Sequence, residues 1–340
     1  MHLDPGPVPK GVAGELARVA AAAGFMRRAE PILEAYRADA MIERLSLFAG
    51  GAGTLAARLG VPRLVEINAP IVEERVRHFG LHHQDLAIAL EHRVLEGARV
   101  TVVSEALVAW AAARGAREVT VIGNGVDAAR FAPRPAERTV VRARLGVDDA
   151  QVVGFCGSLK PWHGLEVLVS AFAQLVSECP RLVLVVVGDG PGRAWLKGQA
   201  QAKAMAGRML LTGAVAASDV PSYVAGFDIA VAPFLPSEDF YFSPLKVAEA
   251  MAAGLPVIAS RLDPIEAMLG NAGELFTAGD AGELARAIRR LAEDPVRAGR
   301  LGQAARRRAE TDLSWDRCAE RILTIVRLMR TPSARLRRAG

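Results

Sequence analysis

Hydrophobic and polar positions form a repeating pattern in the second half of the chain, from about residue 138 onward. Short runs of consecutive apolar residues, such as Leu-Val-Leu-Val-Val-Val at 182–187, alternate with stretches in which apolar residues recur at helical spacing. A strand that is apolar at every position is typical of a parallel sheet with helices on both faces. The pattern therefore predicts a complete doubly wound α/β domain. Its expected strands are 152–156, 182–187, 209–212, 228–232, 257–259 and 273–276, and its expected helices are 164–176, 194–205, 219–223, 244–253 and 281–293.

The first half shows the same alternation with fewer strands. Apolar runs predict strands at 40–42, 63–66, 100–103 and 119–122, and helical spacing predicts helices at 11–37 and 85–95. Doubly wound domains usually have more strands than these four. Since no apolar strand precedes residue 40, we expect a Rossmann-like N-terminal domain that lacks its opening strands.

The composition of the 340 residues, 51% hydrophobic and 23% charged, indicates a globular protein long enough for two domains. The net charge of +5 arises mainly from basic residues at 306–308 and in the tail 331–340. A solvated helix face and a frayed tail explain these residues most simply. A basic face that touches anionic lipid is the alternative. Nucleic acid is not an expected partner, because no aromatic residues are interleaved with the basic ones.

Three widely spaced cysteines, Cys156, Cys179 and Cys318, lack the spacing of a zinc site or a disulfide framework. No charged segment followed by a long apolar core opens the chain, and no run reaches the roughly 18 apolar residues of a membrane span. These patterns predict a cytoplasmic protein, with peripheral membrane contact as the alternative. Four histidines gather at 78–92, but without a neighbouring carboxylate motif we expect no metal there.

Residues 243–260 contain the most informative motif of the chain. Ser243 as N-cap and Pro244 as first helical residue predict a helix of about three turns, which a glycine ends before a buried strand. The helix N-terminus offers free N–H groups and a partial positive charge to a phosphate. Lys246 and Glu249 share one face of the first turns, so they indicate a site for a sugar nucleotide. A capped surface helix with an ion pair is the alternative interpretation.

This motif resembles the nucleotide-sugar signature of family 4 of the retaining GT-B glycosyltransferases. The signature commonly has Glu, seven residues, Glu, and then Ala-Met-Ala-x-Gly-x-Pro-Val. Glu249 matches the second Glu, whereas Tyr241 stands where the first is expected. Glu238 and Asp239 are near enough in sequence to replace that carboxylate.

Two other segments resemble the domain organisation of this family. Residues 124–133, which contain Asn-Gly-Val-Asp followed by Phe and Pro, resemble the link between its two domains. The amphipathic stretch 314–329 resembles the helix that closes its C-terminal domain and packs back toward the first. The resemblance implies a GT-B fold with two Rossmann-like doubly wound domains. The expected parts are an incomplete acceptor-side domain at 1–135, a nucleotide-sugar-binding domain at 136–312, the closing helix at 313–330 and a basic tail at 331–340.

The loop 157–164 follows a strand and opens a helix, which is the usual position of a phosphate cradle. In many family members an Arg and a Lys of this loop neutralise the diphosphate, and Ser158 and His163 occupy those two positions here. We therefore expect Lys160 and Lys246 to neutralise the diphosphate in their place. A structural turn with a solvated Lys160 is the alternative.

Two further turns lie where a nucleotide could bind. The segment 188–193 fails as a dinucleotide motif, because Arg193 stands at the third glycine position. Its Gly190 and the following proline resemble a turn of the family instead. Residues 212–215 resemble the loop whose backbone amides pair with the nucleotide base, which makes Ala214 and Val215 candidates.

The resemblance implies transfer of a sugar from a UDP- or GDP-linked donor with retention of configuration and without a cofactor or metal. Lys160 and Lys246 would hold phosphates and Glu249 the ribose; these three form the candidate catalytic set. The candidate donor-binding residues are Gly157, Ser158, His163, Gly190, Ala214, Val215, Ser243, Pro244 and Leu245. On the side of the acceptor, a glycan, a lipid-linked or a small molecule, the candidates are Glu73 and Asn68, which stands where relatives often have a His.

Two other functions fit parts of the sequence. A non-catalytic nucleotide-sugar-binding or partner protein would keep the features of 152–260, and Asn68 and the missing strands favour it. A sugar-nucleotide 2-epimerase shares the general architecture, but it should have acid/base carboxylates and histidines that we cannot assign. An incomplete N-terminal domain also predicts weak transferase activity of the 340-residue form with donor binding retained.

Overall fold

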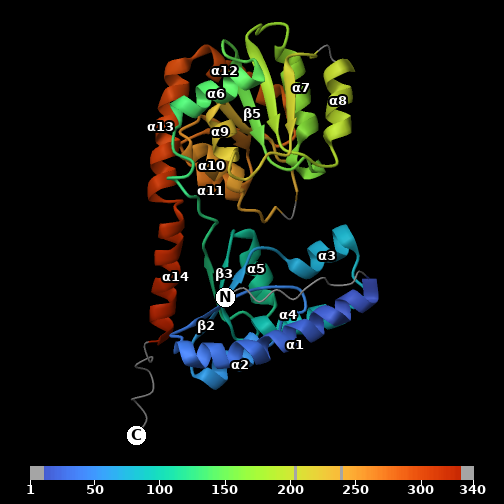
Figure 1. Cartoon of the computed structure of the whole chain (residues 1–340), viewed down its shortest axis with the longest axis vertical. Coiled ribbons are helices and arrows are strands. Elements are labelled where there is room, and N and C mark those ends of the chain that lie inside the picture. The colour runs from blue at the N-terminus through green and yellow to red at the C-terminus, as the bar shows by residue number, and fades with distance from the viewer. Residues whose placement is uncertain (1–10, 203–204, 238–239, 331–340) are drawn as a thin grey trace. The chain divides into compact units, whose positions relative to one another are not determined.

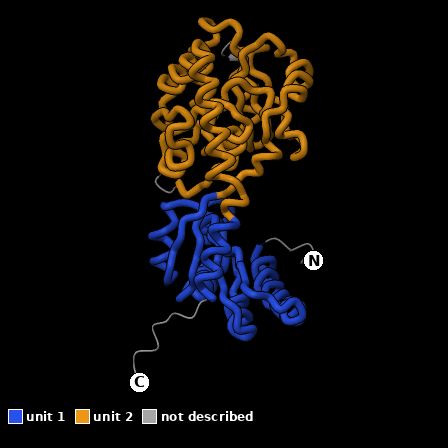
Figure 2. Tube along the Cα trace, turned by 90° about the vertical axis from the view of Figure 1, so that its left-hand side faces the viewer, with its two compact units in different colours: residues 1–123, 319–340 blue, residues 124–318 orange. Residues whose placement is uncertain are grey.

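The computed structural model describes residues 11–202, 205–237 and 240–330. Contacts divide the chain into unit 1, which comprises 1–123 and 319–340, and unit 2, which comprises 124–318 (Figure 2). Each unit has one parallel sheet flanked by helices (Figure 1). The two sheets confirm the expected pair of Rossmann-like domains.

Unit 1 has a four-stranded parallel sheet of order β1-β2-β3-β4. The strands lie close to the predicted ranges, and the buried residues belong to the two central strands, β2 and β3. They are β1 (Met41–Arg44), β2 (Arg63–Ile67), β3 (Arg99–Val102) and β4 (Glu118–Val121). The helices are α1 (Gly11–Tyr36), α2 (Ala52–Leu59), α3 (Ile71–Phe79), α4 (Gln84–Leu95) and α5 (Ala106–Ala113).

Unit 2 has a six-stranded parallel sheet of order β10-β9-β8-β5-β6-β7. Its strands are β5 (Gln151–Cys156), β6 (Leu182–Val187), β7 (Met209–Gly213), β8 (Ile229–Ala232), β9 (Val257–Ser260) and β10 (Glu274–Phe276). Its helices are α6 (Pro135–Leu145), α7 (Leu165–Leu175), α8 (Arg193–Ala202), α9 (Val220–Ala225), α10 (Leu245–Ala252), α11 (Asp263–Leu269), α12 (Ala281–Glu293) and α13 (Pro295–Thr311). A short 3-10 turn, η1 (Pro161–His163), precedes α7.

Strand β6 shows why the sheet of unit 2 needs helices on both faces. All six of its residues are buried. Because successive side chains of a strand point to opposite faces, Val183, Val185 and Val187 lie in one apolar core and Leu182, Leu184 and Val186 in the other. The first core also contains residues of α9, α10, α11 and α13, and the second contains residues of α7, α8 and α12.

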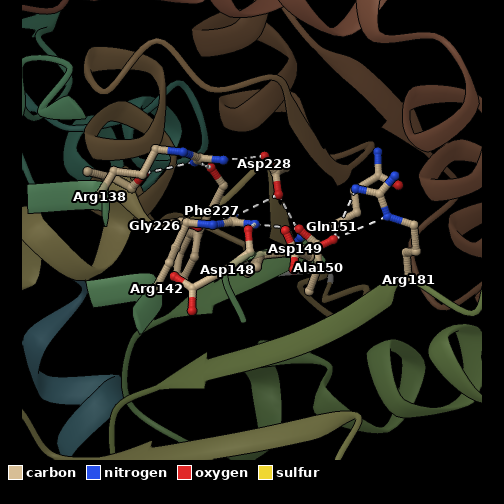
Figure 3. A network of polar contacts seen from close by, with 12 residues as sticks. Arg138, Arg142, Asp148, Asp149, Ala150, Gln151, Arg181, Gly226, Phe227 and Asp228 are labelled. Carbon is tan, nitrogen blue, oxygen red and sulfur yellow. Dashed lines mark hydrogen bonds and ion pairs between the residues drawn. The ribbon is translucent and has the colours of Figure 1, made fainter. Parts of the chain in front are cut away.

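The amino ends of β5 and β8 are joined by a network of polar contacts around Asp228 (Figure 3). Its Oδ1 accepts a hydrogen bond from Arg138 Nη2 at 2.5 Å, and its Oδ2 accepts from Arg142 Nη1 at 3.0 Å. The backbone N–H of Val152 also donates to Oδ2, at 2.7 Å. One carboxylate therefore connects helix α6 to the two central strands of the sheet.

The connecting segment 124–131 belongs to unit 2, although the sequence placed it in a first domain ending at 135. The physical reason is packing, because Val126 and Phe131 are buried in the core of unit 2. The Val126 N–H donates to the carbonyl oxygen of Leu313 at 2.7 Å. Helix α14 (Trp315–Arg330) follows, with Ser314 Oγ accepting from the Arg317 N–H, and its residues from Ala319 onward group with unit 1.

Candidate functional site

The chain reverses its direction across the sheet of unit 2 between β5 and β8. From β5 it proceeds outward to β6 and β7, and from β8 it proceeds the other way to β9 and β10. In open α/β sheets ligands bind beyond the carboxyl ends of the strands at such a switch point, because the loops there diverge. The candidate site therefore lies where the loop after β5, 157–164, meets the segment after β8 and the start of α10.

Lys246 of α10 reaches across this switch point. Its Nζ atom lies 4.4 Å from the centroid of the Phe155 ring and 4.8 Å from that of Phe234. A Cβ on Gly157 would lie 2.9 Å from Nζ, so a larger residue at 157 would displace the ammonium from this position. Within the described part of the chain, Nζ is buried and has no hydrogen-bond partner. An anion bound here would supply both the opposite charge and the missing acceptor.

Burial sets the protonation of Lys246. Loss of hydration lowers the pKa of its ammonium to about 7, although Cys156 and Glu249 act in the opposite direction. The interpretation as a surface helix with an ion pair does not hold, because the ammonium is enclosed by aromatic rings rather than solvated.

Glu249 and Cys156 lie close enough to Lys246 to interact with it electrostatically. Burial raises the pKa of the Glu249 carboxyl, and Arg130 and Lys246 offset part of that effect. Burial likewise raises the pKa of the Cys156 thiol to about 12, with a further increase from Glu249. Cys156 is therefore a protonated thiol at neutral pH and not a nucleophile.

His163 is neutral at neutral pH. Burial and the cations Lys246 and Lys160 lower the pKa of its ring to about 4, against the effect of a hydrogen bond to Ser158. Its Nδ1 lies 2.5 Å from the Ser158 carbonyl oxygen, which can only accept, so Nδ1 bears the proton. His163 thus offers a lone pair at Nε2 and does not provide the positive charge of the lysine common in relatives.

Lys160 and Ser158 lie on the exposed part of the loop after β5. Lys160 Nζ stands 4.8 Å from the centroid of the Trp162 ring, a cation–π contact that orders the side chain without burying it. The loop is tied to the turn after β6, where the Leu159 N–H donates to the Asp189 carbonyl oxygen at 3.0 Å. A Cβ on Gly190 would lie 2.8 Å from the Leu159 nitrogen, so the close approach of these loops requires glycine.

Ala214 and Val215 follow β7 at the same edge of the sheet. Ala214 is exposed, Val215 is half-buried, and the turn before them is joined to the turn after β6 by a hydrogen bond from Gly188 N–H to the Gly213 carbonyl oxygen at 3.0 Å. These residues share the sheet edge with Lys246 but belong to loops farther from the switch point.

The prediction that Ser243 caps helix α10 and that Pro244 is its first residue is wrong. The helix begins at Leu245, Pro244 has extended backbone angles, and no side chain caps the helix in the region described. The reason is that Ser243 Oγ accepts a hydrogen bond from the backbone N–H of Asn124 at 2.9 Å. The first N–H groups of α10 are therefore left without a side-chain acceptor.

The acceptor-side candidates Asn68 and Glu73 lie in unit 1. Asn68 follows β2, and both polar atoms of its side chain are buried without a hydrogen-bond partner among the residues described. Glu73 Oε1 accepts hydrogen bonds from Trp110 Nε1 and from Arg114 Nη2. Arg114 also donates to the buried Glu91 at 2.7 Å, so Glu73 belongs to a charged cluster.

In the described ranges, no three His, Cys, Asp or Glu side chains gather as a metal site would require. The backbone N–H groups of His82 and His83 donate to the Glu15 carboxylate. None of the helices traced in 11–330 is both long and apolar enough to cross a membrane. Glu238, Asp239 and the tail 331–340 lie outside the described residues.

Sequence reasoning missed four participants in this site. Phe155 and Phe234 enclose the ammonium, Arg130 acts on the Glu249 carboxyl, and Asn124 holds Ser243. Asn124 lies in the segment recognised as a link between domains, but nothing in its local sequence reveals a partner 119 residues away.

Known proteins resemble this chain in the same region. Residues 150–294 match the family described as glycosyl transferases group 1. A GDP-mannose-dependent alpha-(1-6)-phosphatidylinositol monomannoside mannosyltransferase of Mycolicibacterium smegmatis is 31% identical over 196 residues, which are 56% of this chain and 51% of the relative. A D-inositol 3-phosphate glycosyltransferase of Nocardioides is 32% identical over 228 residues, 62% of this chain and 49% of the relative. The chain thus spans about half the length of these curated relatives.

Solved structures agree on the fold over most of the chain. The Anabaena protein HepE, solved with UDP, superposes with a TM-score of 0.74 at 23% identity, over 94% of this chain and 84% of HepE. Residues 150–294 thus match the glycosyl transferases group 1 family, and the likeness to solved structures and the two parallel sheets give the chain the GT-B fold.

Proposed function

We propose that unit 2 binds a nucleoside diphosphate sugar, linked to UDP or GDP, and that the protein transfers the sugar to an acceptor with retention of configuration. The observation that carries the proposal is the buried ammonium of Lys246, which has no acceptor among the described residues. It lies at the switch point of a group 1 glycosyl transferase domain, beside the uncapped N-terminus of α10. Such a donor agrees with the relatives, which include a GDP-mannose-dependent mannosyltransferase, and with HepE, which was solved with UDP.

The chemistry of this proposal is stabilisation of the leaving group. As the bond between the sugar and the diphosphate breaks, negative charge builds on the phosphate oxygens. Lys246, Lys160 and the backbone N–H groups at the start of α10 would face that charge. Positive groups fixed in advance are effective because they need no reorganisation during the reaction. In this proposal they take the part that a metal ion has in other transferases.

The remaining donor groups have complementary roles. Glu249 would accept hydrogen bonds from ribose hydroxyls, and the neutral His163 would accept one at Nε2 from a sugar hydroxyl. The backbone of Gly157, Ser158 and Gly190 would lie along the diphosphate, with Ser243 and Pro244 leading into the helix start beside it. Ala214 and Val215 would pair with the base through their amides.

Unit 1 would supply the acceptor side, where Asn68 is the main candidate. An amide has donors and an acceptor, so its two unpartnered atoms suit a hydroxyl group, which can accept and donate in return. Glu73 would hold its place in the cluster with Arg114 rather than act as a free base. The acceptor is proposed to be a glycan, a lipid-linked or a small molecule, and the location cytoplasmic, with any membrane contact peripheral.

The first test is ligand stabilisation. A panel of UDP, GDP and their sugars, measured with and without a chelator, should raise the Tm for one nucleotide series, because a ligand that binds only the native state stabilises it. Product analysis with that donor then separates the candidates. Glycoside formation supports transfer, an epimerised sugar supports an epimerase, and binding without turnover supports a non-catalytic protein. No shift with any nucleotide overturns the proposal.

A further inference from the structure

Asn124 is the first residue of unit 2 and makes two hydrogen bonds to Ser243. Its backbone N–H donates to Ser243 Oγ at 2.9 Å, and its Nδ2 donates to the Ser243 carbonyl oxygen at 3.1 Å. Ser243 is only 8% exposed, so both bonds are largely shielded from water. Leaving a shielded polar group without a hydrogen-bond partner costs free energy, so the two bonds hold Asn124 and Ser243 together.

These bonds hold Ser243, which lies two positions before the first residue of α10. Ser243 directly precedes Pro244, whose ring fixes its φ angle, here −77°. The direction in which the chain enters α10 therefore follows from the place of Ser243. Lys246 lies in the first turn, and its Nζ would be only 2.9 Å from a Cβ on Gly157, which places the ammonium beside the loop after β5. A small displacement of that turn would separate the ammonium from the loop after β5.

The other end of α10 is tied to the same connecting segment. Arg306 Nη1 donates to the Ala128 carbonyl oxygen at 2.6 Å and to that of Ala252, the last residue of α10, at 2.5 Å. A cation at this end also suits the negative pole of the helix. Residues 124–128 are thus linked to both ends of α10, through Ser243 at the first and through Arg306 at the second.

The connecting segment is itself held in place. The Val126 N–H donates to the Leu313 carbonyl oxygen at 2.7 Å. A Cβ on Gly125 would lie 2.8 Å from ring atoms of Trp315, so the segment lies flat against the start of α14. A fixed segment can position what is bonded to it, whereas a loose one could not.

We propose that Asn124 is a positioning residue for the phosphate end of the donor site. Through Ser243 it sets the place of the first turn of α10 and so the distance between Lys246 and the bound diphosphate. The inference rests on the proposed function and adds to it the connection between the two units. Strain in residues 124–126 would then change the affinity for the diphosphate and not for the nucleoside.

The test compares UDP with uridine in calorimetric titrations of the full chain. Asn124→Ala and Ser243→Ala should each weaken UDP binding about tenfold, a change of about 1.4 kcal/mol, and uridine binding less than twofold. Ser243→Thr keeps the hydroxyl acceptor and should retain the affinity for UDP. Ser243→Ala keeps the test available if Asn124→Ala does not fold, because it removes a single hydroxyl.

Gln151→Ala is the matched control. The Gln151 amide also donates to a distant backbone carbonyl, that of Ala292, at 2.9 Å, but it lies at the amino end of β5. It should lower the Tm while leaving the affinities for UDP and uridine within twofold. A loss of Tm without a change in the ratio of the two affinities in Asn124→Ala and Ser243→Ala would overturn the inference alone. No binding of UDP or GDP by the unmodified chain would overturn the proposed function and the inference with it.

Discussion

At the scale of single residues, the site depends on an ammonium that the fold holds in an unfavourable place. Lys246 is buried against two aromatic rings, and its pKa of about 7 reflects the hydration it has lost. Such groups are often found where a ligand restores the missing interactions. The lysine is therefore suited to respond to a phosphate more strongly than a solvated lysine would.

Removal of the Lys246 ammonium should affect phosphate recognition selectively. Charge-assisted hydrogen bonds contribute about 1.5–3 kcal/mol, so Lys246→Ala should weaken UDP binding roughly tenfold or more and leave uridine nearly unchanged. Lys197→Ala, at an exposed lysine of α8, is the control and should alter neither. Equal losses for UDP and uridine in calorimetry would contradict the assignment of Lys246 to the phosphates.

The affinity for UDP should fall as the pH rises from 7 to 9. In the free protein the pKa of Lys246 is lowered to about 7, so above pH 7 a proton must be taken up before the charged lysine can bind the diphosphate. The decrease should approach tenfold per pH unit and disappear in Lys246→Met. Titrations at pH 8 in buffers of different ionisation enthalpy would measure the proton uptake directly. A flat pH profile would show that the lysine stays charged or does not participate.

Glu249 should matter for the ribose and not for the fold. Burial raises the pKa of its carboxyl, which means that the folded protein holds this charge at a cost. Glu249→Ala should therefore keep the Tm and weaken UDP binding by about 1–3 kcal/mol, with no effect on a UDP analogue that lacks ribose hydroxyls. A strong drop of the Tm, or the same loss for both ligands, would identify a structural residue instead.

At the scale of elements, the helices and strands that could be predicted were those determined by the local pattern of apolar residues. Strand β6 could be predicted because six consecutive apolar residues are typical of a strand buried on both faces of a parallel sheet. Of helix α13 only a solvated face at 306–308 was expected, because its sequence is rich in Arg, Gly and Ala and its buried positions depend on contact with α10. Ser243 was misassigned because its hydroxyl bonds a distant backbone N–H rather than its own helix.

The Asp228 network should be worth more than an exposed ion pair. Asp228→Asn removes the charge that faces Arg138 and Arg142 at the start of the two central strands (Figure 3). We expect a loss of about 2–4 kcal/mol in the free energy of unfolding, since partly buried cations are left unpaired. The control Glu266→Gln breaks the exposed pair with Arg261 and should cost less than about 1 kcal/mol. Urea denaturation measures both, and similar losses would show that the network contributes little.

At the scale of the whole molecule, the donor-site candidates all lie in unit 2, from Gly157 to Glu249. A ligand at 100 times its Kd stabilises the state that binds it by about 2.7 kcal/mol. In scanning calorimetry of the full chain, UDP should therefore shift the transition of unit 2 by roughly 5–10 °C and leave that of unit 1 in place. One transition that shifts as a whole would mean that the two units unfold together.

The division of the chain into two units has a consequence for its synthesis. Unit 2 is continuous in sequence, whereas unit 1 combines 1–123 with residues from Ala319 onward. Because domains fold as units while a nascent chain emerges, unit 2 has all its residues once Cys318 is translated, before the rest of α14. Unit 1 thus begins first and is completed last, and the hydrogen bond from Arg321 of α14 to the Val121 carbonyl oxygen of β4 forms only then.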